Sequence, residues 1–212
     1  MRSNRRLSRS MLALSTTAML AMALMAGGLA RQDDSPSPTT ADGPSTWTVD
    51  AVHSTVLFRV KHMKAGAFWG RFNDPSGEIS WDHTGQVCPK FDISVPISSV
   101  DSGNEKLDGH LRSMDFFNEP EHPNMVFKST GCTPNGVNRW DMSGELTLLG
   151  KTKPVKVDLE LVGQADLGRG HRSGFEAKFT IKRSEFGMDW GVERGSLGDT
   201  VQIIVSLEMV KQ

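Results

Sequence analysis

Histidine and serine side chains are the residues of this chain that could do chemistry, and their spacing argues against metal binding and catalysis. The six histidines stand at positions 53, 62, 83, 110, 122 and 171, and none shows the His-x-His or His-x-x-x-His spacing of a metal site. His53 and His62 bracket one expected strand, and an extended segment of that length spans ~30 Å. The sequence therefore predicts no metal site.

A nucleophile with an activating base is not evident either. The sequence contains no Gly-x-Ser-x-Gly elbow, no phosphate-cradling loop and no obvious pair of acids. An esterase acting on a bound lipid would need a residue such as Ser54, and no nucleophile–base pair is visible. We therefore expect a protein that is not an enzyme and that has no cofactor.

The two cysteines, Cys88 and Cys132, are expected to form a disulfide. Both lie at expected strand ends, in the part of the chain that an N-terminal signal sequence would export. In an oxidising compartment an even pair of cysteines is more often bridged than free. A redox role is the alternative, but there is no Cys-x-x-Cys spacing and no adjacent base to stabilise a thiolate. The bridge would contribute about 3–4 kcal/mol through loop entropy.

The N-terminus has the three parts of an export signal. Four arginines within the first nine residues form a basic region, residues 11–25 form an apolar run that is short for a membrane span, and Gly28-Leu29-Ala30 offers a small-x-small cleavage site. We predict a signal peptide over residues 1–30, cleaved near Ala30. An uncleaved membrane anchor is the alternative.

The rest of the chain is predicted to be a linker and one domain. Residues 31–45 are rich in Ser, Pro, Asp and Thr and cannot bury enough apolar surface to fold. Residues 46–212 suffice for one domain with a core. The net charge is −1 and the basic residues after the signal are scattered, so nucleic acid is not an expected partner.

Alternation of apolar and polar residues predicts an all-β fold. It is clearest over residues 56–60, 91–97, 155–161, 175–181 and 201–209. About eight or nine such strands leave two architectures, a sandwich or an up-and-down barrel. Inward positions rich in Phe and Met favour an antiparallel barrel of about eight strands, wide enough for one elongated ligand. A filled core is the alternative, because periodicity does not reveal a cavity.

One short α-helix is predicted over residues 102–114. Ser102 and Glu105 have the spacing of a capping box. Leu107, Leu111 and Met114 fall on one face, which should be buried. The following pair, Phe116-Phe117, should divide between the interior and the support of the helix.

A Gly-rich segment, residues 183–191, is the second notable feature. It contains Phe186, Met188 and Trp190, which are apolar side chains in a loop. These residues could form a lid on a barrel mouth or cap the core at one end, and the sequence leaves both interpretations open.

Several blocks in consistent order resemble the YceI-like polyisoprenoid-binding proteins of bacteria. The resemblance extends from Trp47 to about Met209. It is carried by Trp47-Thr48-Val49-Asp50, His53-Ser54, Gly70-Arg71-Phe72, Ser102-Gly103-Asn104-Glu105-Lys106, Phe116-Phe117, Gly150-Lys151-Thr152-Lys153-Pro154-Val155 and Arg183-Ser184-Glu185-Phe186-Gly187-Met188. The chain has Trp47 where the family often has Tyr, and it has no Tyr at all. Any hydrogen bond to a ligand head group must therefore come from another residue type.

The resemblance implies an extended lipocalin-like barrel in the periplasm or outside the cell. Such a barrel would hold a long isoprenoid (a polyprenyl, a prenyl pyrophosphate or a quinone) or a similar acyl lipid, for carriage, storage or stress protection. An interaction module for a membrane quinone or respiratory component is the alternative. The sequence leaves open whether the protein also contacts a membrane transiently and whether it forms a homodimer.

The expected site residues form two groups. The lining of the lipid cavity is expected to comprise Phe58, Val60, Phe72, Phe116, Met125, Phe127, Phe179 and Phe186. The candidate contacts to the head group are His53, His62 and Arg112.

Overall fold

Strands account for most of the structure, a computed structural model that describes residues 43–82 and 87–212. The strands are β1 (Ser45–Val49), β2 (Thr55–His62), β3 (Gly66–Phe72), β4 (Ser76–Trp81), β5 (Lys90–Pro96), β6 (Val100–Asp101), β7 (Asn124–Pro134), β8 (Arg139–Leu148), β9 (Lys151–Asp166), β10 (His171–Lys182) and β11 (Leu197–Lys211). The helices are α1 (Glu105–Arg112) and the short 3₁₀ helices η1 (Ala51–His53), η2 (Ile97–Ser99) and η3 (Arg183–Phe186). The predicted signal peptide and most of the predicted linker lie outside the described residues.

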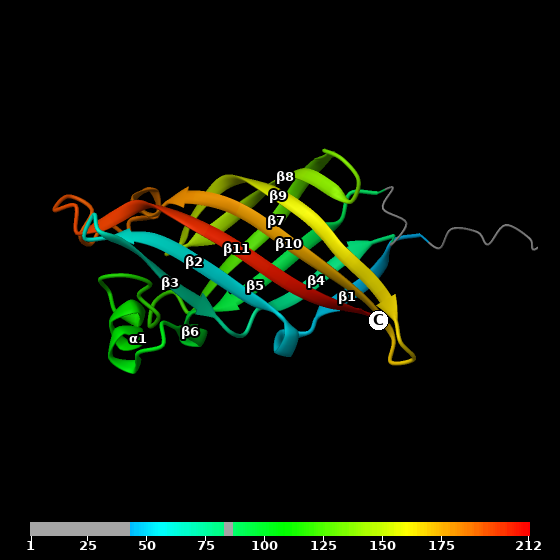
Figure 1. Cartoon of the computed structure of the whole chain (residues 1–212), viewed down its shortest axis with the longest axis horizontal. Helices are drawn as coiled ribbons and strands as arrows, with labels where there is room; N and C mark the ends of the chain where they lie inside the picture. Colours follow the sequence, from blue (N-terminus) through cyan, green and yellow to red (C-terminus); the bar gives the residue numbers. More distant parts are fainter. Residues whose placement is uncertain (1–42, 83–86) are drawn as a thin grey trace, which may run out of the picture. The chain divides into compact units, whose positions relative to one another are not determined.

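The predicted antiparallel barrel is confirmed, because the sheet closes on itself. Eight strands follow one another in the order β1-β4-β5-β7-β8-β9-β10-β11, and β11 then pairs with β1, where Met209 lies opposite Val49. β11 is long enough to have two neighbours along one edge. Its final residues pair with β1, whereas residues 197–206 pair with β2. β2, β3 and β6 thus continue the wall toward the end of the barrel where α1 lies (Figure 1).

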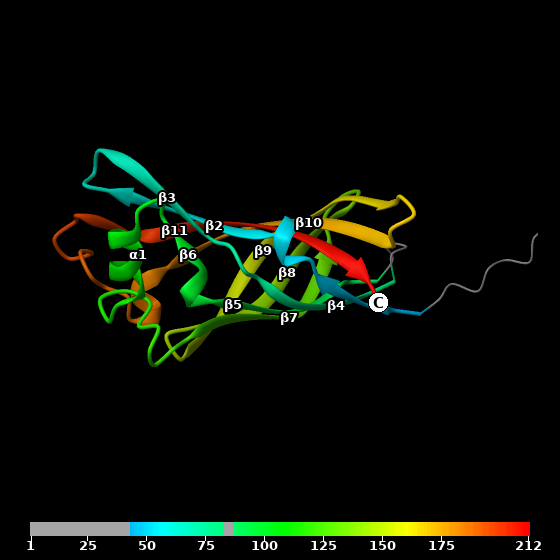
Figure 2. The same cartoon turned by 90° about the horizontal axis from the view of Figure 1, so that it is seen from below.

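Aromatic rings fill the opposite end of the barrel. The ring centroid of Trp81 lies 5.8 Å from Trp47 and 5.2 Å from Phe175, and that of Phe175 lies 5.4 Å from Phe91. All four side chains are buried. This end is therefore sealed by packing, whereas the other end carries α1, the β2–β3 hairpin and the loop between η3 and β11 (Figure 2).

The predicted helix exists, but a different residue caps it. The Asn104 side-chain oxygen accepts a hydrogen bond from the Leu107 N–H at 3.0 Å. Ser102 Oγ instead bonds to the backbone of Asn104. The predicted capping box of Ser102 and Glu105 is therefore wrong, because the residue that reaches the free N–H lies two positions later.

The predicted burial of Met114 is also wrong. The helix ends at Arg112, and Ser113 adopts an extended backbone with ψ 174°. Leu111 is buried and Leu107 is half-buried, but Met114 is 80% exposed. The helical spacing stops applying where the helix ends.

None of the described helices is both long and apolar enough to cross a bilayer.

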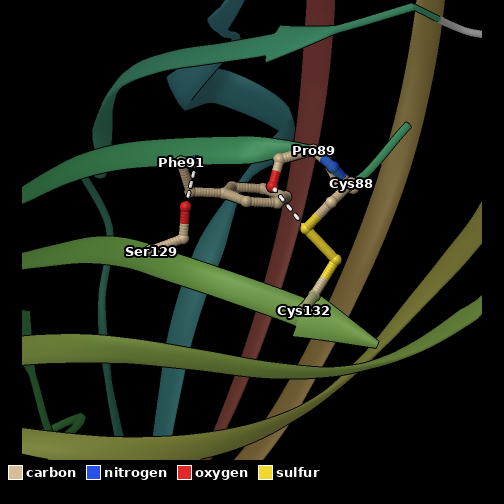
Figure 3. Close-up of a disulfide and its surroundings, with 5 residues drawn as sticks. All are labelled: Cys88, Pro89, Phe91, Ser129 and Cys132. Carbon is tan, nitrogen blue, oxygen red and sulfur yellow. Dashed lines mark hydrogen bonds between the residues drawn. A yellow bond between two sulfur atoms is a disulfide. The ribbon is translucent and has the colours of Figure 1, made fainter. Parts of the chain in front are cut away.

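The predicted disulfide between Cys88 and Cys132 is confirmed (Figure 3). It joins the segment before β5 to β7, with Cα atoms 5.9 Å apart. Beside it, the Phe91 N–H donates to Ser129 Oγ at 2.9 Å. Backbone pairing of β5 with β7 begins only at Asp92 and Lys128, so the disulfide and this hydrogen bond hold the two strands together beyond their ladder.

Candidate ligand-binding cavity

The barrel encloses an apolar cavity of about 410 Å³. This volume lies in the range of cavities that bind small molecules. Its wall is formed by inward-facing side chains of β2, β3, β5, β7, β8, β9, β10 and β11, together with α1 and its following segment. Among the described residues, the lining side chains with a titratable group are His62, His110 and Arg183.

Two inward-facing glycines make room for large rings in the wall. A Cβ atom at Gly70 would lie 2.3 Å from the ring of Phe58, and one at Gly144 would lie 2.3 Å from the ring of Phe127. Both rings therefore lie flat over a neighbouring strand where no side chain stands. Aromatic side chains covering a strand glycine stabilise a sheet in the same way. The rings line the cavity without filling it.

Three rings gather at the mouth of the cavity. The imidazole of His110 on α1 lies edge-on to Phe116 at 4.9 Å and to Trp190 at 5.3 Å, and Phe116 lies 5.2 Å from Trp190. His110 Nε2 is 2.9 Å from Asp115 Oδ2. The helix and the loop before β11 thus meet over the open end of the barrel.

Arg183 holds that loop in place from inside. Its side chain is buried and donates to the backbone carbonyls of Gly198 at 2.8 Å, Met188 at 3.0 Å, Trp190 at 2.8 Å and Leu197 at 3.3 Å. Burial lowers the pKa of the Arg183 guanidinium below its ordinary value, while Asp199 and Asp189 act in the opposite direction. The backbone carbonyls satisfy its donors, and no carboxylate within residues 43–82 and 87–212 forms an ion pair with it.

Seven of the eight expected lining residues do line the cavity, namely Phe58, Val60, Phe72, Phe116, Met125, Phe127 and Phe179. The expectation for Phe186 is wrong, because its ring is buried in the core and is not part of the cavity wall. Of the loop residues with two open interpretations, Met188 and Trp190 line the cavity, whereas Phe186 caps the core. Phe117 also lines the cavity, 5.3 Å from Phe72.

The three head-group candidates are not brought together. His62 lines the mouth of the cavity. His53 is exposed and its Nδ1 is 3.0 Å from Asp50 Oδ2, away from the cavity lining. Arg112 faces Glu119, with Nε and Oε2 3.8 Å apart, and does not line the cavity. The expectations for His53 and Arg112 therefore do not match the geometry.

His110 and Arg183 are the polar lining residues that sequence reasoning missed. Arg183 continues the inward series of Phe175, Ala177, Phe179 and Ile181 at a spacing of two, so the alternation of β10 indicated its direction. His110 adjoins Leu111 and lies three residues after Leu107, on the helical face that packs inward. Both signals were present, but a charged residue at the end of a strand is usually exposed.

Asp50, His53 and Glu208 are the described residues whose ligand atoms come within 4.8 Å of one another. Arg172 already fills this cluster, since its Nη1 donates to Asp50 Oδ2 at 2.7 Å and also to Glu208. Arg172 and then His53 hold the pKa of Asp50 near 2. An arginine takes the place that a cation would need.

Ser54, the residue considered as a nucleophile, is used by the fold. Its Oγ accepts a hydrogen bond from the Glu208 N–H at 2.9 Å, and its side chain is buried. The neighbouring His53 ring is bonded to Asp50 instead.

Comparisons with known proteins agree with this architecture. The YceI-like domain model matches residues 47–209. A UPF0312 protein of Pectobacterium carotovorum is 37% identical over 161 residues, which cover 76% of this chain and 82% of that protein. Protein YceI of Escherichia coli O157:H7 is 35% identical over 161 residues, 76% of this chain and 83% of that protein.

Solved structures share the barrel. BcnA of Burkholderia cenocepacia is 25% identical with a TM-score of 0.66, over 76% of this chain and 98% of that chain. The YCEI protein of Campylobacter jejuni is 28% identical with a TM-score of 0.64, over 72% and 89%. A polyisoprenoid binding domain from Saccharophagus degradans, 17% identical with a TM-score of 0.60 over 78% and 98%, shares the fold. The cavity-bearing barrel and these relatives together show that the chain belongs to the YceI-like domain family.

Proposed function

We propose that this protein is an exported carrier or store that holds the tail of a long isoprenoid or similar acyl lipid inside its barrel. The observation that carries the proposal is the apolar cavity of about 410 Å³, whose wall is formed almost entirely by hydrocarbon and aromatic groups. Each CH₂ group moved out of water contributes about 0.8 kcal/mol. A long tail therefore binds such a cavity without a specific polar contact.

The head group of the ligand is proposed to remain at the mouth. His62 offers hydrogen-bonding groups there, and so does the ring nitrogen of His110 that is not bonded to Asp115, whereas the donors of Arg183 are already committed to the loop. A neutral head group with one or two acceptors, such as that of a quinone, fits this mouth better than a pyrophosphate, which would need more positive charge.

The compartment is proposed to be the periplasm or the exterior. The disulfide between Cys88 and Cys132 fits an oxidising compartment, and the N-terminal sequence has the pattern of a cleaved signal. Transient contact with a membrane is supported by exposed apolar side chains in the hairpin, the segment after α1 and the loop, namely Met63, Trp69, Met114 and Trp190. Tryptophan at such a rim is typical of membrane interfaces.

A non-catalytic role agrees with the geometry around Ser54 and His53 described above. An accessory module without a ligand of its own would be favoured by a filled core. The cavity favours a carrier instead. One neighbour in fold is named a polyisoprenoid binding domain, which agrees with the proposed ligand class.

Mass spectrometry of an organic extract of the purified mature protein tests the proposal directly. We expect a co-purifying isoprenoid or acyl lipid, and we expect a dansyl-labelled long-chain fatty acid or a prenyl probe to bind with about micromolar affinity. An empty extract together with no binding of either probe would overturn the proposal.

A further inference from the structure

The wall of the barrel is not continuous between β9 and β10. Their ladder runs from Asp166 and His171 to Asp158 and Lys178 and stops there. Beyond that point β10 still pairs with β11 as far as Lys182, and β9 still pairs with β8 back to Lys151. Each strand keeps its outer neighbour, so two unpaired edges face each other over residues 154–157 and 179–182.

The sequence of β9 maintains this gap. The β8–β9 turn, Leu149-Gly150, has two residues of positive φ, as in a two-residue hairpin. Leu148 and Lys151 therefore exchange both hydrogen bonds, and bonded pairs alternate with non-bonded pairs from there. Pro154 and Lys156 fall at non-bonded positions, where the backbone nitrogen points away from β8 and into the gap. Pro154 has no N–H to offer to β10.

A groove of about 600 Å³ follows the point where the strands separate. Its outer rim comprises Asp141, Lys156, Asp158, Lys178, Thr180, Gln202 and Ile204. Its deeper part is formed by Met142, Val157, Phe179 and Ile203, all of which also line the central cavity. The same four side chains thus lie on both the groove and the cavity.

Burial along the inward face of β10 decreases toward the gap, and Ala177, the last inward residue of the ladder, is already half-buried. Phe175, in the paired part, is buried, whereas Phe179 and Ile181, beside the gap, are only half-buried although they also face inward. The rim carries no excess of one charge, because Asp141 and Asp158 balance Lys156 and Lys178. The deeper part of the groove suits a hydrocarbon chain better than an anion.

We propose that the gap between β9 and β10 is a side portal through which the hydrocarbon tail of the bound lipid enters and leaves the barrel. This inference rests on the proposed function. An apolar tail can slide sideways past Val157 and Phe179, and the rings at the mouth do not have to separate for exchange. Lysines on the two open edges disfavour the addition of a further strand.

Joining the two edges tests the portal. Lys156 and Thr180 are exposed and would lie opposite each other if the ladder continued. The Lys156→Cys, Thr180→Cys variant is joined by a short bismaleimide under non-reducing conditions, which preserve the native disulfide. Stopped-flow measurements with the dansyl-labelled fatty acid should show association and dissociation slowed by about tenfold or more, with the equilibrium affinity nearly unchanged.

The matched control joins the same strands where they are already paired. Glu160 and Glu176 are register partners, and the Glu160→Cys, Glu176→Cys variant treated in the same way should exchange the probe at the rate of the unmodified protein. Unchanged rates in the joined Lys156, Thr180 variant would overturn the portal while leaving the proposed function intact. Absence of probe binding in every form would instead count against the proposed function.

Hydrogen exchange gives an independent measurement on the unmodified protein. The Lys156 amide points into the gap, so it should exchange quickly without ligand and become protected when the probe is bound. The Glu160 amide, which lies inside the ladder opposite Glu176, should be slow in both states. Equal and slow exchange of both amides would mean that the strands are paired, and the portal would be excluded.

Discussion

Phe116 is the residue at which the helix region, the loop and the cavity meet. It lines the cavity, it is buried, and its ring contacts both His110 and Trp190. Phe186 is equally buried but lies outside the cavity wall. Comparing variants at these two positions therefore distinguishes the effect of a phenylalanine on ligand binding from its effect on core packing.

We expect Phe116→Leu to weaken binding of the dansyl-labelled fatty acid by about three- to tenfold, because it removes apolar contact area from the ligand. Phe186→Leu should lower the free energy of unfolding by about 1–2 kcal/mol and leave the affinity for the probe unchanged. Fluorescence titration and thermal unfolding of both variants check this. Equal affinities in the two variants would mean that Phe116 is an ordinary core residue.

Arg183 is the other residue with a testable role, since it joins η3 to the loop before β11. Arg183→Lys keeps the charge but cannot supply hydrogen bonds in four directions, and we expect a loss of about 2–4 kcal/mol in the free energy of unfolding. Fluorescence of Trp190 should report loosening of the loop. The exposed neighbour provides the control, and Lys182→Met should change neither quantity.

At the scale of the elements, β3 has two glycines in contrasting surroundings. A Cβ atom at Gly70 would lie 2.3 Å from the Phe58 ring, whereas one at Gly66 would meet nothing within 4 Å. The shape of the cavity therefore requires a glycine at position 70 of β3, whereas position 66 has room for a larger side chain.

We expect Gly70→Ala to push the Phe58 ring into the cavity. Stability should fall by about 1–3 kcal/mol, as in an overpacked core, and probe affinity should fall with it. Gly66→Ala should stay within about 0.5 kcal/mol of the native protein. Combining Gly70→Ala with Phe58→Leu should restore part of the affinity, and a double variant weaker than either single variant would contradict this account.

At the scale of the whole molecule, the mouth of the ligand cavity and the disulfide lie at different ends. The cavity opens beside α1, while the disulfide joins β5 and β7 near the end that Trp47 and Trp81 seal. Loss of the disulfide should therefore alter stability and leave the mouth of the ligand site unchanged.

Removing the disulfide tests this separation. Cys88 and Cys132 are 44 residues apart, and a loop of that size implies a loss of about 4 kcal/mol on removal. The double Ser variant should melt roughly 8–16 °C lower for a domain of this size and should bind the probe with nearly native affinity. A large loss of affinity in the folded variant would show that the two ends are coupled.

Local patterns predicted much of this fold and part of its site. Alternation in β10 and β11 identified strands and their inward residues, because side chains of a strand alternate between faces whatever the neighbours are. The position of the helix was also predictable, but its cap and its end were not. Several polar side chains lie between Asp101 and Asp108, and each accepts from a different N–H group, namely Asp108 from Ser102, Asp101 from Gly103 and Asn104 from Leu107. Residue type and spacing alone do not specify which side chain reaches which N–H.

The sequence by itself determined the strands, the cysteine pair and the apolar character of the interior, since each depends on residue type and short-range spacing, and its resemblance to the YceI-like proteins implied the barrel. Only the tertiary structure decided that Phe186 lies outside the cavity wall and that Arg183 lines the cavity. It also decided that His53 and Arg112 lie away from the cavity and that β9 separates from β10. These features depend on the register between strands distant in sequence and on how closely the rings pack. Neither quantity is encoded in the periodicity of a single segment.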